Sequence, residues 1–308
     1  GNEFRLEQLK KIGKKATIVG IGQALVTTVI VDAGLIALSF ILPEGCLPLP
    51  AAIILGAVAT ATAPAATLMV VRQYKAKGPL TDILLPIVAL DDAVGLVLFA
   101  ISFGVAKALI HGKVDVLSIV LEPILEVVLS LGLGLVMGLL FTFFEKFFHS
   151  RSKRLSMSVA FVFVTVAISM IKVEIGGVHI AFSSLLVCMM LGTIFCNMCD
   201  FSGELMDRVD RWSAPLFILF FVISGAELEL NVFSDAAIII VGIVYIIFRS
   251  IGKYVGTYAS AKATKCSPQI CKYLGITLFP QAGVALGMCA TAMQLGEQGN
   301  LIRNITLF

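Results

Sequence analysis

Apolar segments of about 20 residues recur along this chain, and this repetition constrains its fold more than any other feature. Each segment is long enough to cross a hydrocarbon core of roughly 30 Å as a helix. Of the 308 residues 58% are hydrophobic and only 14% are charged, whereas about a quarter are charged in a soluble domain. The segments also lack the polar face of a helix on a soluble protein. The sequence therefore predicts an all-α integral membrane protein.

The apolar runs between charged, proline or glycine breaks predict nine complete spans and the start of a tenth. They are Ala16–Leu42, Pro50–Val71, Asp82–Ile110, Pro123–Phe144, Leu155–Ile171, Val178–Cys199, Trp212–Leu230, Asp235–Ala261 and Ile270–Leu295, with Leu301 onward entering the next. The loops are short, so we expect no soluble domain between spans. Because the chain starts at Gly1 and stops inside an apolar run at Phe308, we expect a polytopic bundle truncated at both ends.

The distribution of lysine and arginine predicts the orientation. Of the 23 basic residues, 17 fall in loops on the side of residue 1, 4 on the other side and 2 within a span. Basic loops stay cytoplasmic, so residue 1 is predicted on the cytoplasmic side of a bacterial-type plasma (inner) membrane. The basic residues gather on no single face, so a nucleic-acid partner is not expected. Cys196 and Cys199 have a zinc-like spacing, but no second pair completes a site.

Charged residues inside a membrane are costly and usually mark function. Asp91 and Asp92 lie near the middle of their span, since Asp92 is ten residues into it, about 15 Å deep. Arg249 lies near the centre of the eighth span. Asp32 and Glu126 are weaker candidates, because either could face water or a neighbouring helix nearer a span end.

Two spans are interrupted near mid-depth. In the second span the sequence is Thr60-Ala61-Thr62-Ala63-Pro64, and proline cannot donate a backbone hydrogen bond and disfavours helix in the residue before it. In the ninth span, Pro280-Gln281-Ala282-Gly283 lies at a similar depth. A single membrane proline usually only kinks a helix, but both of these breaks are close in sequence to a mid-membrane charge.

The first three and the last three spans run in opposite directions, each set with its interrupted span in the centre. This order predicts an inverted-topology repeat, in which half-helix ends meet around an ion site at the midplane. The symmetry follows from topology and not from sequence similarity.

A desolvated carboxylate at this depth favours a proton or a cation, and the two compete. Adjacent helical residues point about 100° apart, so Asp91 and Asp92 cannot share one proton face to face. The hydroxyl of Thr62 and the carbonyls of residues 61–63 are oxygen ligands that a hard cation such as Na⁺ prefers. The pattern predicts exchange of a monovalent cation, most simply Na⁺ with Li⁺ or K⁺ as options, for a proton by alternating access.

Arg249 has three possible roles. It could neutralise one aspartate, hold a carboxylate in reserve, or bridge the carbonyls of the interrupted helices. Unlike a lysine, it does not readily lose its proton.

Residues 59–67 (ATATAPAAT) and 86–95 (PIVALDDAVG) resemble the cation:proton antiporter superfamily, in its aspartate-pair sodium/proton exchanger branch. Residues 215–217, 221–228, 249–254 and 279–286 add support, and the match covers the chain in order. The resemblance implies an NhaA-like antiporter fold with two crossed discontinuous helices and a homodimer. It divides the chain into core residues 1–147, dimerisation helices in 148–230 and an incomplete second core repeat in 231–308.

The resemblance also implies roles for single residues. It makes Asp92 the principal ion- and proton-binding carboxylate, with Asp91 as its helper. Residues of the interrupted helices and their neighbour support the site: Ala63, Pro64, Arg249, Pro280 and Gln281. Some relatives pair the arginine with a glutamate that corresponds to Gln23 here, which leaves Asp91 or Asp32 as the expected partner of Arg249.

Three other classes are possible from the residues. A potassium-efflux system gated by a nucleotide-binding domain would need a domain that these residues do not supply. A sodium-coupled solute symporter would not need the aspartate pair. An intramembrane aspartyl protease needs facing aspartates on two helices, and no other acid offers a matching motif. We therefore expect a transporter and no enzyme, with no cofactor besides the transported cation, and with membrane lipid and a second copy as partners.

Overall fold

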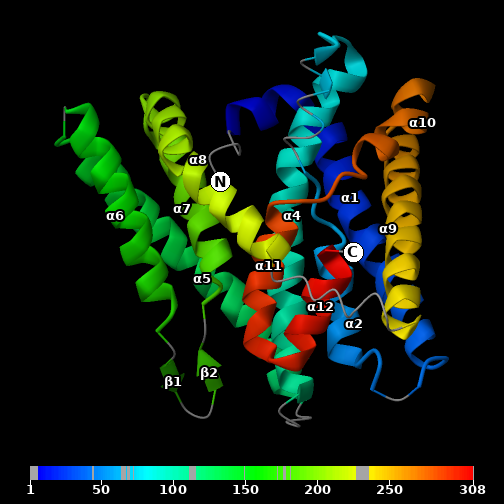
Figure 1. Cartoon of the computed structure of the whole chain (residues 1–308). Helices are drawn as coiled ribbons and strands as arrows, with labels where there is room; N and C mark the ends of the chain where they lie inside the picture. The colour runs from blue at the N-terminus through cyan, green and yellow to red at the C-terminus, as the bar shows by residue number, and fades with distance from the viewer. Residues whose placement is uncertain are drawn as a thin grey trace. The chain divides into compact units, whose positions relative to one another are not determined.

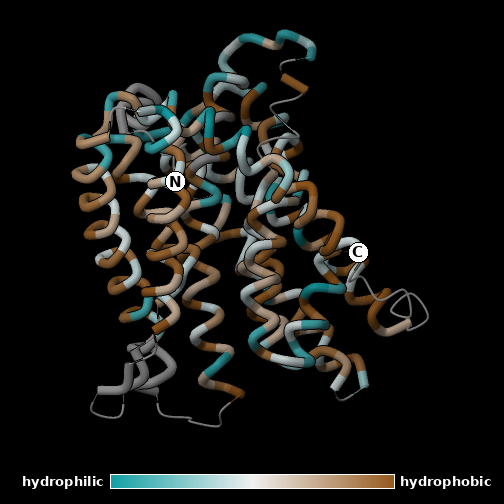
Figure 2. The backbone as a smooth tube through the Cα atoms, turned by 60° about the vertical axis from the view of Figure 1, so that its left-hand side comes forward, coloured by the Kyte–Doolittle hydropathy of each residue, from teal (hydrophilic) through white to brown (hydrophobic). Residues whose placement is uncertain are grey.

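A computed structural model describes residues 6–307, except for positions 44, 64–66, 68–69, 72, 111–115, 149, 172, 176–177, 181 and 227–235. The described chain is a bundle of helices with one short hairpin, and hydrophobic residues predominate along the helices (Figure 2). Contacts divide it into two compact units. The first unit comprises residues 1–7 and 113–227, and the second unit comprises residues 8–112 and 228–308.

The second unit contains three long helices and several short ones (Figure 1). The elements are α1 (Leu6–Ser39), α2 (Leu49–Val58), α4 (Pro79–Ile110), α9 (Ala236–Ala263), α10 (Pro268–Thr277), α11 (Val284–Ala292), a 3-10 turn (Met293–Leu295) and α12 (Glu297–Leu307). α2 packs on α4, and α10 packs along α9. α2 ends at the first interruption and α10 and α11 flank the second, so the ends of these short helices meet within this unit.

Glycines on α9 allow α1 to approach it closely. A Cβ at Gly252 would lie 2.9 Å from the Cα of Thr27, and one at Gly256 would lie 3.0 Å from the Cα of Gln23. Any larger residue at these positions would push the helices apart. The close approach places Gln23 beside the face of α9 that carries Lys253.

The first unit contains α5 (Val116–Glu145), α6 (Arg151–Ser169), α7 (Ser184–Met198) and α8 (Ser202–Ala226). α5 packs along α7, where a Cβ at Gly134 would lie 2.6 Å from the carbonyl oxygen of Val187. The core between these helices is apolar and mostly aromatic or branched, with Met137, Phe141, Leu191, Phe195, Cys199 and Leu205.

The strands β1 (Val173–Ile175) and β2 (Val178–Ile180) form an antiparallel hairpin in which Val173 is opposite Ile180. The predicted span Val178–Cys199 was therefore wrong at its start, because α7 begins only at Ser184. The sequence carries a glycine pair between two β-branched runs, which is a hairpin signal that the hydropathy argument overrode.

Five helices in the described residues are long and apolar enough to cross a membrane. They are Gly13–Ser39, Pro79–Ile110, Pro123–Glu145, Arg151–Ser169 and Ala236–Ala263. Three other predicted spans coincide with shorter apolar helices, namely α2, α7 and the α11 segment. The predicted span Ile270–Leu295 is divided into α10 and α11, as its internal break predicted.

The units separate between residues 112 and 113, and not at residue 147 where the sequence placed the first boundary. The reason is that α5 packs along α7 and so belongs with the helices that follow it. The roles expected for the domains, ion translocation and dimerisation, stay predictions.

Candidate functional site

The first helix interruption follows α2. The backbone N–H groups of Thr60 and Ala61 bond three residues back, to the carbonyls of Ala57 at 3.1 Å and Val58 at 3.2 Å. This tightened turn ends the helix, and residues 61–63 have no regular secondary structure. The predicted breaker Pro64 lies outside the described residues. The carbonyls that follow, of residues 59–61, accept hydrogen bonds from side chains of α9 instead.

The second interruption separates α10 from α11. Gly283 starts the new helix at φ +34°, a conformation that side chains rarely adopt. The backbone N–H of Ala63 donates to the carbonyl oxygen of Pro280 at 2.8 Å, and Gln281 Nε2 donates to the carbonyl of Val58 at 3.0 Å. The two interrupted segments therefore cross and are joined by hydrogen bonds, which confirms the predicted crossing.

Arg249 on α9 binds carbonyls from both interruptions. Its Nε donates to the carbonyl of Ala59 at 3.1 Å, one terminal nitrogen donates to Ala61 at 2.9 Å and the other to Phe279 at 2.5 Å. These carbonyls follow the C-terminal ends of α2 and α10, which carry partial negative charge. A guanidinium with five fixed donors suits such a set of acceptors. Of the three roles considered for Arg249, the structure shows the bridge between carbonyls.

Asp91 on α4 is fully buried and receives donors on both oxygens. Lys253 Nζ lies 2.7 Å from Oδ2, which also accepts a hydrogen bond from the hydroxyl of Thr62. Gln23 donates from Nε2 to Oδ1. The ion pair expected between Arg249 and an aspartate is thus made by Lys253 instead. Asp91 is a charge held by a lysine, an amide and a hydroxyl.

Lys253 is fully buried and was not predicted as a site residue. Besides Asp91, its ammonium donates to the carbonyl of Thr60 and, at 2.9 Å, to the hydroxyl of Thr62. The sequence carried a signal for it. Lys253 lies four residues after Arg249, so the two share one face of α9.

Asp92 is half-buried, in contrast to its neighbour. The turn of about 100° between adjacent helical residues separates the two carboxylates, as the sequence predicted. The charges of Asp92 and Lys253 interact, so the three titratable groups form one electrostatic site. Asp92 is thus the more exposed of the two carboxylates.

The remaining predicted residues are placed as follows. Ala63, Pro280 and Gln281 lie at the crossing, where Gln281 also bonds the hydroxyl of Tyr245 at 3.0 Å. Glu126 lies on α5 in the first unit, apart from the unit that contains Asp91.

Asp32 packs against α2. Its Oδ1 is so close to Gly56 that a Cβ there would lie 1.8 Å away. Within the described part of the chain this buried oxygen has no hydrogen-bond partner.

The ammonium of Lys253 is coordinated by three oxygens, one each from Asp91, Thr62 and the carbonyl of Thr60, which together form an oxygen cluster. Oxygens of these kinds are the ligands of a hard cation. The carbonyls predicted as cation ligands include that of Ala61, which is instead bound by Arg249. Across the described residues no cluster of three His, Cys, Asp or Glu could hold a resident metal.

The chain matches one family model and solved structures of known proteins. The family described as "Sodium/hydrogen exchanger, transmembrane" matches residues 1–308. Among solved structures, the sodium proton antiporter MjNhaP1 from Methanocaldococcus jannaschii has a TM-score of 0.71 and 18% sequence identity, and the match covers 100% of this chain and 76% of that one. That likeness shows a shared fold. A search of curated proteins found no match.

Proposed function

This chain belongs to the sodium/hydrogen exchanger family and is a cation:proton antiporter, and we propose that it exchanges Na⁺ for protons at Asp91, Asp92 and Lys253. One observation carries the assignment of the site. The ammonium of Lys253 fills a buried cluster of oxygens that a small monovalent cation would also use. The lysine and the transported cation therefore compete for the same carboxylate.

The charge balance of the site explains how competition becomes exchange. With Lys253 protonated, Asp91 is neutralised and needs no further cation. A Na⁺ that binds Asp92 and then Asp91 supplies the positive charge that the ammonium had supplied, so Lys253 can release its proton. A lysine can do this, whereas Arg249 keeps its proton and holds the crossing together in both states.

The chemistry assigns each remaining group a task. Asp92, as the half-buried carboxylate, receives the cation or a proton first. Thr62 supplies a hydroxyl oxygen to the oxygen cluster, and Gln23 holds Asp91 in its orientation. Because cation ligands must be deprotonated, cation affinity falls as the pH falls, by up to about tenfold per pH unit for one competing proton.

The test is proton movement in proteoliposomes that are acid-loaded and then exposed to Na⁺, Li⁺ or K⁺. The full-length protein should dissipate the gradient with Na⁺, and Asp92→Asn and Lys253→Gln should not. Asp32→Asn is the matched control, because Asp32 also has a buried carboxylate oxygen in this unit but does not belong to the oxygen cluster. If Lys253→Gln exchanges as fast as the parent, the lysine is not the competing group and this assignment is wrong.

We further propose a bacterial-type plasma membrane with residue 1 on the cytoplasmic side. The basis is the loop count of 17 basic residues against 4. Cysteines introduced at Lys75 and Lys113 test it in a variant without the native cysteines, since Cys46 lies in a predicted outer loop. A membrane-impermeant reagent applied from outside should then label only position 113.

We also propose a homodimer through the helices of residues 148–230. Large apolar side chains on α6 and α8 are exposed there, among them Phe163 at 67% and Ile218 at 65%. A second copy would cover part of this surface. Cross-linking of cysteines placed along α8 in native membranes tests the proposal, and exclusively monomeric protein would overturn it.

A further inference from the structure

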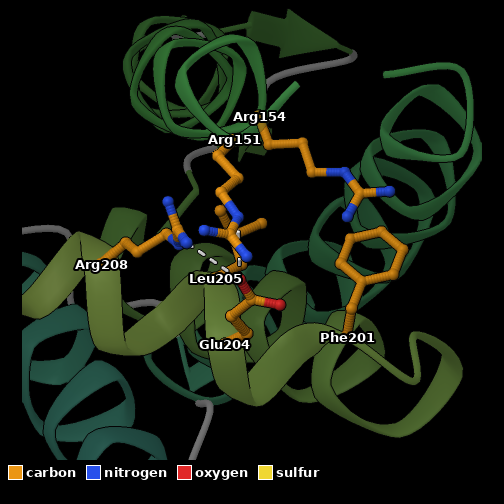
Figure 3. A pocket seen from close by; sticks show the side chains of 6 residues that line it. All are labelled: Arg151, Arg154, Phe201, Glu204, Leu205 and Arg208. Carbon is orange, nitrogen blue, oxygen red and sulfur yellow. Dashed lines mark hydrogen bonds and ion pairs between the residues drawn. The ribbon is translucent and has the colours of Figure 1, made fainter. Parts of the chain in front are cut away.

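A shallow hollow lies in the first unit, where α6 and α8 begin (Figure 3). Its space, including the open mouth, is about 220 Å³. The lining is mostly cationic and comprises Arg151, Arg154, Phe201, Glu204, Leu205 and Arg208. None of these residues takes part in the exchange site.

One carboxylate serves two of the three guanidiniums. Arg208 lies 2.9 Å from Glu204 Oε1, and Arg151 lies 3.6 Å from the same oxygen, as Figure 3 shows. Each guanidinium has five N–H donors, so a single shared oxygen leaves most of them available. Arg151 is 78% exposed and can turn toward a ligand.

The third guanidinium is fixed in place. Arg154 Nε donates to the carbonyl of Phe148 at 2.5 Å, and the guanidinium carbon lies 3.7 Å from the ring centroid of Phe201. The Nε of Arg154 also lies 3.9 Å from Oε2 of the buried carboxylate of Glu145. Stacking on an aromatic ring pre-organises an arginine, so less entropy is lost when its outer nitrogens bind an anion.

The two helix starts add to the positive potential. α6 begins at Arg151, and its N-cap Ser150 makes no side-chain hydrogen bond to the first turn. α8 begins at Ser202 and packs against α6. Backbone N–H groups at helix N-termini favour anions, and phosphate oxygens are suited to arginine forks.

The position of the hollow specifies the kind of anion. α6 is apolar and long enough to cross a membrane, so its first turn lies at one membrane face. Below that turn the exposed side chains of α6 and α8 are hydrophobic, including Phe163 at 67% and Phe217 at 56%. A phosphate bound in the hollow would therefore continue into acyl chains along an apolar surface.

We propose that this hollow binds the phosphate of an anionic phospholipid, with Arg151 and Arg208 as its mobile ligands and Arg154 as its fixed one. The proposal is independent of the exchange site and of which membrane face carries residue 1. Glu204 holds the two mobile arginines in the absence of lipid and is displaced from one of them by the phosphate.

The experiment measures lipid-dependent thermal unfolding of the full chain in detergent. Phosphatidylglycerol is titrated into the parent protein and into Arg151→Gln/Arg208→Gln, with phosphatidylcholine and inorganic phosphate in parallel. The expected result is saturable stabilisation by phosphatidylglycerol and an apparent affinity lowered on the order of tenfold in the double variant. Arg154 is left intact because it holds the start of α6 to Glu145 at the end of α5 and to the carbonyl of Phe148.

Lys262→Gln/Lys265→Gln is the matched control, because it removes two exposed charges from a helix end in the other unit. It should bind phosphatidylglycerol as the parent does. An equal loss in this control would reduce the effect to general surface charge and overturn the proposal. Equal stabilisation by phosphatidylcholine would also overturn it. If inorganic phosphate gives saturable stabilisation at a similar concentration, the ligand of the hollow is a free phosphate, and the assignment to a lipid is wrong.

Discussion

One ion pair from each unit lies at each extreme of solvent exposure. In the second unit Asp91 and Lys253 are both completely buried at 2.7 Å. In the first unit Arg151 and Glu204 are 78% and 57% exposed at 3.6 Å. An exposed pair contributes about 0–1 kcal/mol, and a buried pair adds little more than apolar residues of the same volume would. Stability therefore does not explain the buried pair, which is consistent with its proposed role in ion exchange.

The largest effect is expected from breaking the buried pair. Lys253→Met leaves Asp91 as an uncompensated buried carboxylate, which should cost about 3–5 kcal/mol and abolish exchange. The double variant Asp91→Asn/Lys253→Met should regain most of the thermal stability and remain inactive. Thermal unfolding and proteoliposome transport measure the two effects separately. A double variant as unstable as the single one would show that the pair is needed for folding.

The next effect should come from Arg249. Arg249→Lys keeps the charge but cannot reach three carbonyls at once, so at least one stays unsatisfied at about 1–3 kcal/mol. We expect slower exchange with an unchanged cation preference, measured as initial rates for Na⁺ and Li⁺. A changed preference would mean that Arg249 shapes the cation site directly.

A smaller effect is expected from Thr62. Thr62→Val keeps the shape and removes a hydroxyl that bonds both Asp91 and Lys253, and Thr62→Ser keeps that hydroxyl. The valine variant should raise the KM for Na⁺ by about tenfold, as expected for one lost hydrogen bond to a charged group. The serine variant should stay near the parent, and equal behaviour of the two variants would remove Thr62 from the site.

The smallest effect should come from the exposed pair. Arg208→Gln removes a 2.9 Å contact to Glu204 and should change the free energy of unfolding by less than about 1 kcal/mol. Exchange in proteoliposomes of phosphatidylcholine alone should keep its rate, because no residue of the site is touched. A large loss of stability here would remove the contrast between the units.

The sequence predicted the features that depend on local chemistry. Proline and glycine predicted the two helix interruptions, and hydropathy predicted the depth of the aspartate pair, which stays a prediction. It did not predict which aspartate is buried, because that depends on the rotation of α4 against α1 and α9. The sequence placed Lys253 within a span but indicated no role for it. Its partner Asp91 is 162 positions away in the sequence, so local sequence patterns do not connect the two. The boundary near α5 was misplaced because it depends on packing against a later helix.

The hydrogen bond from Ala63 to Pro280 has a mechanical consequence. Together with the hydrogen bonds of Arg249 to the carbonyls of Ala59, Ala61 and Phe279, it joins the two helix interruptions into one rigid body. Such a body cannot part along its own crossing without leaving several carbonyls unsatisfied, so we expect the site to change sides as a piece. The amide proton of Ala63 should then exchange with solvent as slowly in the cation-bound protein as in the proton-bound one.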